Sequence, residues 1–137
     1  MHFGLESRAF VVAALIVTTS LALTMWHDGD AMWWYAATHE PTCTQCQDMA
    51  AAAYLRVGDV PRAIERQEQA VRVSATTAFP RWERHWNLAE LWLLAGNRVA
   101  AQQAFLRYLA AVPPEDRQHP ADRGHIEVAK AALLRLP

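Results

Sequence analysis

The chain contains two cysteines, Cys43 and Cys46, within the segment "THEPTCTQCQDM". Their spacing suits a local disulfide, a redox-active dithiol, part of a metal site or a c-type haem attachment site. Haem attachment requires a histidine directly after the second cysteine, and Gln47 occupies that position. Three interpretations remain: a structural or intermolecular role, a redox couple, and a metal site.

The residues around the pair bear on the redox and metal interpretations. Thr42 and Gln45 form a capping-box pattern, which places Cys43 in the first turn of a helix. A thiol in that position has a lowered pKa, as in reactive cysteine pairs. No alternating strand and helix pattern surrounds the pair, which argues against a complete thioredoxin-like oxidoreductase. For zinc or copper, the candidate ligands are His39, Cys43 and Cys46, with His27, Asp28 or a partner residue as the fourth.

Composition indicates one all-α domain. The 137 residues suffice for a single core, and the seven prolines fall mostly between periodic stretches. Thirteen basic residues against 14 acidic ones leave no basic excess, so nucleic acid is not an expected partner. No Ser-His-Asp grouping, phosphate-binding loop or spaced carboxylate pair stands out. We therefore predict a protein that is not an enzyme and needs no cofactor.

Residues 9–26, "AFVVAALIVTTSLALTMW", form an apolar run without a charge. As a helix this run extends about 27 Å, close to the roughly 30 Å of a bilayer core. The segment "AMWWYAA" follows it with ring types that favour the headgroup region. A cleaved signal peptide with "SLA" before the cut is the alternative. We predict an uncleaved single-pass transmembrane helix, contacting the membrane through residues 9–26.

The charges beside this run give a direction to the predicted span. Arg8 precedes it, whereas Asp28 and Asp30 follow it, so the positive-inside rule predicts a periplasmic or otherwise outer-facing domain. The predicted organisation is a membrane anchor at residues 1–26, a juxtamembrane linker at 27–42 with a short interfacial helix over 31–38, and a helical domain at 43–137.

The helical domain contains two similar helix-turn-helix units. Gly58 and Gly96 mark their turns, 38 residues apart, in "VGDVP" and "AGNRV". Apolar residues recur at three- and four-residue spacings on both sides of each turn, which predicts helices. Aligning the two glycines superposes Ala51 on Ala89, Tyr54 on Trp92, and Ala63 on Ala101.

Over residues 44–115 these units resemble the tetratricopeptide repeat, a helix-turn-helix of 34 residues. That family places alanines where neighbouring backbones approach closely, and Ala63, Ala70 and Ala101 match this pattern. Tyr108 departs from it, because it stands where the first copy has Ala70, and "AFPR" adds four residues between the units. The resemblance implies a two-repeat solenoid closed by a C-terminal capping helix. The expected apolar stripe of that helix is Ile126, Ala129, Leu133 and Leu134.

In such a stack the first helix of each repeat lines a groove that takes a peptide or a partner helix. Trp82, Trp86 and Trp92 place three indoles within eleven residues, more ring surface than one helix of a small domain needs to bury. For at least one of Leu93 and Leu94, burial in the core is an equal alternative to the groove. The groove residues implied by the resemblance are Gln45, Asp48, Ala52, Leu55, Arg56, Glu83, Trp86, Glu90, Leu93 and Leu94.

Two repeats are fewer than the roughly three that such arrays normally require. A partner protein, a second copy of the chain or the aromatic residues after the apolar run are therefore expected to cover the remaining surface. The first functional hypothesis is a non-catalytic, membrane-anchored adaptor or accessory subunit that assembles a membrane complex. The alternative is a thiol- or metal-handling maturation factor that acts through Cys43 and Cys46.

Overall fold

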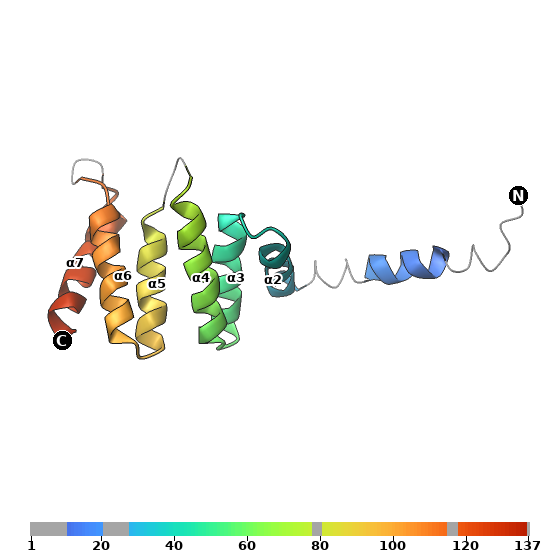
Figure 1. Cartoon of the computed structure of the whole chain (residues 1–137), viewed down its shortest axis with the longest axis horizontal. Helices are drawn as coiled ribbons and strands as arrows, with labels where there is room; N and C mark the ends of the chain where they lie inside the picture. Colours follow the sequence, from blue (N-terminus) through green and yellow to red (C-terminus); the bar gives the residue numbers. More distant parts are fainter. Residues whose placement is uncertain (1–10, 21–27, 78–80, 115–117, 137) are drawn as a thin grey trace, which may run out of the picture.

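A computed structural model describes residues 11–20, 28–77, 81–114 and 118–136. Every regular element in these ranges is a helix, which confirms the all-α prediction. Helices α3 to α7 stand side by side in chain order, and each helix from α2 onward packs against the next one (Figure 1). Their bounds are α2 (Gly29–His39), α3 (Thr44–Arg56), α4 (Val60–Ser74), α5 (Glu83–Leu94), α6 (Arg98–Ala111) and α7 (Pro120–Arg135).

The N-terminal membrane span is a prediction that the structure corrects. Residues 11–20 form a helix, while residues 9–10 and 21–26 of the predicted span lie outside the described ranges. Within those ranges, no helix has the length and apolar character that crossing a membrane requires. The predictions of a transmembrane helix and a single-pass membrane localisation are therefore wrong on this finding, and the outer-facing orientation loses its basis.

Helix α2 lies within the stretch expected to be a linker and packs against the first repeat. The ring of Trp34 stacks on that of Tyr54 in α3, with 5.1 Å between their centroids. The buried Gln47 side chain donates a hydrogen bond from Nε2 to the carbonyl oxygen of Ala37 at 2.7 Å. An aromatic residue expected at a membrane surface thus covers the open side of α3.

The two predicted turns share one backbone geometry. Gly58 and Gly96 have positive φ angles of 78° and 76°, the conformation that glycine adopts at the end of a helix. Around Gly58, the N–H of Asp59 donates to the carbonyl of Tyr54 at 2.9 Å, and the bond from Asn97 to Trp92 repeats this pattern. The carboxylate of Asp59 and the amide oxygen of Asn97 then cap the following helices. The pairs "GD" and "GN" therefore each end one helix and begin another.

The interior combines buried alanines in both repeats with aromatic rings in the second. Ala63, Ala70 and Ala101 have no exposed surface, as expected for positions of close approach. Tyr108 is equally buried, and its ring lies edge-on to Trp86 at a centroid distance of 5.5 Å. Burial, together with the nearby negative charges of Asp122 and Glu83, raises the pKa of the Tyr108 phenol. The departure at Tyr108 is accommodated because it contributes to an aromatic core.

Helix α7 covers the second repeat as the predicted cap. Its first turn is fixed by Asp122, whose carboxylate accepts hydrogen bonds from Trp82 Nε1 at 3.2 Å and from the N–H of His119 at 3.0 Å. The His125 ring stacks on Trp86 with 4.5 Å between centroids. Ile126 and Ala129 are buried and Leu133 is partly buried, but Leu134 is 89% exposed and does not belong to the predicted stripe.

The turn geometry predicts opposite effects for two glycine substitutions. Gly96→Ala should lower the free energy of unfolding by about 1 kcal/mol, because an L residue is disfavoured at positive φ. Gly124→Ala, in the open interior of α7, should raise it by about 0.5 kcal/mol through helix propensity. Urea unfolding of both variants measures this difference. A stabilised Gly96→Ala protein would contradict the turn assignment.

Candidate functional site

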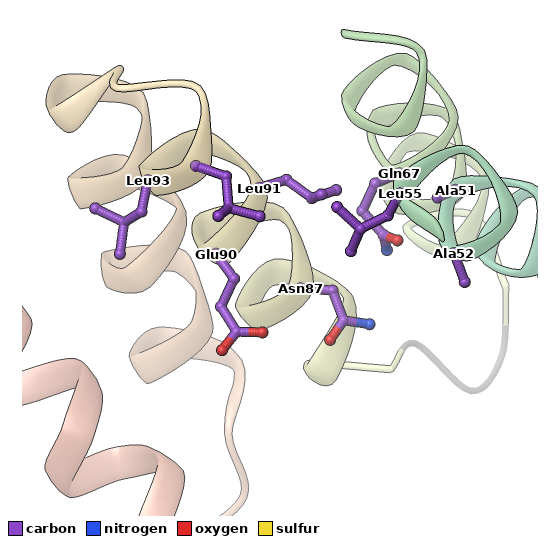
Figure 2. Close-up of a pocket in the computed structure, with 9 residues that line it drawn as sticks. Ala51, Ala52, Leu55, Gln67, Asn87, Glu90, Leu91 and Leu93 are labelled. Atoms are coloured by element: carbon purple, nitrogen blue, oxygen red, sulfur yellow. The ribbon is translucent and has the colours of Figure 1, made fainter. Parts of the chain in front are cut away.

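The first helices of the two repeats, α3 and α5, enclose a groove with a volume of about 650 Å³. In Figure 2, α3 contributes Ala51, Ala52 and Leu55 on one side, and α5 contributes its residues on the other. The groove lies toward the C-terminal ends of both helices, beside the Gly58 and Gly96 turns. We call it the α3–α5 groove; its lining is Ala51, Ala52, Leu55, Gln67, Asn87, Glu90, Leu91, Leu93 and Leu94.

Large apolar side chains form the accessible part of this groove. Leu55 is 41% exposed, Leu93 40% and Leu94 63%, although each lies within a regular helix. Leu93 and Leu94 are therefore groove residues, and the alternative of core burial is excluded for both. Val57 and Val99 are also exposed near the same turns, so apolar surface extends past the end of the groove.

Charge in the groove is limited to one group. Glu90 is the single ionisable side chain among the nine lining residues, and it is exposed. Gln67, on α4, is buried and is held by a hydrogen bond from its Nε2 to Asp48 Oδ1 at 3.1 Å. The groove therefore offers an apolar surface with one acidic edge.

A second concavity lies at the N-terminal ends of α3 and α5, with a volume of about 1090 Å³. Three of the predicted groove residues, Gln45, Asp48 and Glu83, line this region instead of the α3–α5 groove. We call it the N-terminal hollow; its lining is Thr44, Gln45, Asp48, Met49, Thr77, Arg81, Trp82, Glu83, Arg84, Ala111 and Pro113.

Two predicted groove residues lie elsewhere. Trp86 is 8% exposed and packs among Phe105, Tyr108 and His125, because the face of α5 that carries it turns toward α6 and α7. Arg56 forms an ion pair with Asp30 of α2, and its guanidinium lowers the pKa of that carboxyl. Both assignments to the groove are therefore corrected. The sequence pattern did not predict these two positions. The segment that forms α2 was expected to be a linker, and the turn of α5 that carries Trp86 was expected to face the groove.

A largely buried ion pair joins α3 to α5 in the lining of the N-terminal hollow. The Nε and Nη2 atoms of Arg84 both lie 2.8 Å from Asp48 Oδ2. Its Nη1 atom donates a hydrogen bond to Ser74 Oγ at 3.0 Å. The Arg84 side chain is 8% exposed and that of Asp48 is 24% exposed. With Gln67 on the other carboxylate oxygen, the network joins α3, α4 and α5. These contacts fix the separation of the two helices that form the groove.

Arg84 was missed by the sequence analysis, although the sequence contains a signal for it. It lies four and seven residues before Leu88 and Leu91, both of which are buried, so it falls on the apolar stripe of α5. A charged residue on such a stripe indicates a paired, buried group. Asn87 and Gln67 were also missed, and their residue types carry no comparable signal.

The two cysteines form a disulfide at the start of α3. Cys43 is the N-cap residue, and its Sγ accepts a hydrogen bond from the backbone N–H of Cys46 at 3.1 Å. The N-cap is therefore Cys43 and not the predicted Thr42, and Cys43 lies one residue before the first turn in which it was expected. Cys43 and Cys46 are both partly exposed residues.

The metal interpretation finds no support in the described part of the chain. Both thiols are joined in the disulfide, and His39 Nδ1 lies 2.9 Å from the carbonyl oxygen of Tyr35. No group of three or more candidate ligands is gathered among the described residues. His27, one of the fourth ligands considered, lies outside them.

The ion pair predicts an asymmetric response to substitution. Asp48→Ala should cost about 3 kcal/mol in unfolding free energy, because it leaves the buried Arg84 charge unpaired. The double change Asp48→Leu with Arg84→Met should cost less than the single one, since it removes both charges. Lys130→Ala, in an exposed pair with Glu127, is the control and should cost below about 1 kcal/mol. Equal losses for Asp48→Ala and Lys130→Ala in urea unfolding would refute the structural role.

No known protein assigns a function to this site. A scan against protein-family models and a search of curated proteins both give no match. The tetratricopeptide resemblance therefore depends on the paired turns and the buried alanines described above, and membership of that family stays a prediction.

Proposed function

We propose that this chain is a non-catalytic, tetratricopeptide-like adaptor that binds an apolar segment of a partner protein in the α3–α5 groove. The observation that carries the proposal is the exposure of Leu55, Leu93 and Leu94 around one concavity. Full burial of an exposed leucine is favourable by about 1.5–3 kcal/mol, and covering the accessible part of each of these side chains provides a share of that free energy. Covering three such side chains at one place favours association.

The charge of the groove defines the chemistry of the partner. Glu90 gives an acidic edge to an otherwise uncharged lining, so a Lys or Arg of the partner would complement it. The matching segment carries large apolar residues toward the groove and one basic residue toward Glu90. An amphipathic helix or an extended peptide can present side chains in this way.

The groove lining also supports a binding role over a catalytic one. Hydrolysis or group transfer requires a nucleophile with an adjacent base, or a pair of acid and base groups. The nine lining residues include one titratable side chain, that of Glu90, and no serine, cysteine or histidine. The proposal is therefore that the groove holds its partner and performs no reaction on it.

The proposal is tested with the full chain as bait and two matched variants. Leu94→Glu places a charge in the groove, whereas Leu134→Glu makes the same change on the 89% exposed Leu134 of α7. Partners are quantified by mass spectrometry after capture, and circular dichroism confirms that both variants remain helical. Leu94→Glu should reduce capture of specific partners by about tenfold, the effect of losing roughly 1.5 kcal/mol.

A charge-reversal variant and a sedimentation measurement identify the kind of partner. Glu90→Lys should weaken capture of partners with a basic residue in the bound segment, since like charges would then meet. Sedimentation of the chain alone tests whether a second copy occupies the groove. If the unaltered chain is a dimer and Leu94→Glu dissociates it, the occupant is a second copy of the chain. Equal capture by Leu94→Glu, Leu134→Glu and the unaltered chain would refute a groove-dependent function.

A further inference from the structure

The disulfide at the start of α3 joins residues of a single helical turn. Cys43 and Cys46 are three positions apart, so the bridge connects no two helices. In the chain-entropy model, a loop this short contributes much less stabilisation than a long one. Contacts at Gln47, which hold α2 against α3, do not involve either sulfur. The location of the bridge therefore indicates a chemical role more than a mechanical one.

The helix start favours the reduced form of the pair. Cys43 Sγ accepts the N–H of Cys46, and a Cys43 thiolate would keep that hydrogen bond at the positive end of α3. Thiols at helix N-termini within a Cys-X-X-Cys spacing have lowered pKa values. A stabilised thiolate is a better leaving group, so the bridge is opened more readily by an incoming thiol.

A concave surface adjoins the bridge. Thr44 and Gln45, the two residues inside the disulfide loop, line the N-terminal hollow. The lining of the hollow contains two acidic residues, Asp48 and Glu83, and two basic residues, Arg81 and Arg84. Trp82 also lines it. A chain segment held in this hollow would lie beside the disulfide loop, at the opposite end of α3 from the α3–α5 groove.

We propose that the Cys43–Cys46 disulfide is transferred to a protein segment that carries two cysteine thiols and occupies the N-terminal hollow. One thiolate of the segment attacks Cys46 Sγ, forming a mixed disulfide and releasing Cys43 as the stabilised thiolate. The second thiolate of the segment then attacks the segment sulfur that is bonded to Cys46. This step forms the disulfide of the segment and releases Cys46 as a thiolate. The segment loses two electrons and two protons to form its disulfide, and the bridge gains them as two thiols. One chain oxidises one dithiol.

The first test compares the folded chain with its own cysteine segment. A synthetic oxidised peptide of residues 40–48 carries the same bridge without the remainder of the fold. Reduced glutathione at pH 7 should open the bridge of the full chain about tenfold faster than that of the peptide, because Cys43 leaves as a stabilised thiolate. Thiol labelling with mass spectrometry measures both rates. Equal rates would overturn the proposal.

The second test measures the reduced state and the transfer. In a Cys46→Ser chain, thiolate absorbance should give a Cys43 pKa below the ordinary value of about 8.5. The oxidised chain should convert a synthetic peptide with two cysteines into its disulfide, mole for mole. An unshifted pKa, absence of transfer, or loss of helicity on reduction would each overturn the proposal, the last by showing that the bridge is structural.

These outcomes are distinguishable from failure of the proposed adaptor function. Leu94→Glu should leave the glutathione rate unchanged, because the groove and the hollow lie at opposite ends of α3. A chain with Cys43→Ser and Cys46→Ser should still capture partners that bind the α3–α5 groove. A fall in the glutathione rate with Leu94→Glu would show that the two sites are not separate and would overturn the assignment to the hollow.

Discussion

The ion pair between Asp48 and Arg84 is the contact on which the spacing of the two repeats depends. Arg84 contacts Asp48 on α3 and Ser74 at the end of α4, so its position on α5 is fixed from two helices at once. A buried guanidinium without these partners would be strongly destabilising. Because Asp48 lines the N-terminal hollow and its partner Gln67 lines the α3–α5 groove, the same network determines the shape of both surfaces.

The sequence was sufficient to predict the repeats because their geometry depends on local residues. Gly58 and Gly96 are required where the backbone turns left-handed, and the residue after each supplies a cap that only a short polar side chain provides well. The alanines at positions 63 and 101 are fully buried, as close helix approach demands. The leucines of the groove lie on α3 and α5, the first helices of the two units, as the tetratricopeptide resemblance implied.

What the sequence did not predict depends on contacts between distant segments. The tryptophans of α5 were expected to exceed what the domain can bury, yet Trp86 is enclosed because α7 contributes His125 as a stacking partner. Arg56 was assigned to the groove, but α2 supplies Asp30 as its partner. The transmembrane helix predicted from the apolar N-terminal run was also wrong, because no helix in the described part of the chain has the length and apolar character to cross a membrane. A one-dimensional pattern contains none of these pairings.

Helices outside the repeats close both ends of the array, α2 through Trp34 and α7 through Ile126 and Ala129. While α2 and α7 are in place, no third repeat can stack on either end. The concave face is therefore formed by the first helices of two repeats only, α3 and α5. The 12 residues of α5 span about 18 Å, which corresponds to roughly five residues of extended chain. Any motif recognised along α5 is therefore short, and selectivity must come from a few side chains rather than from a long match.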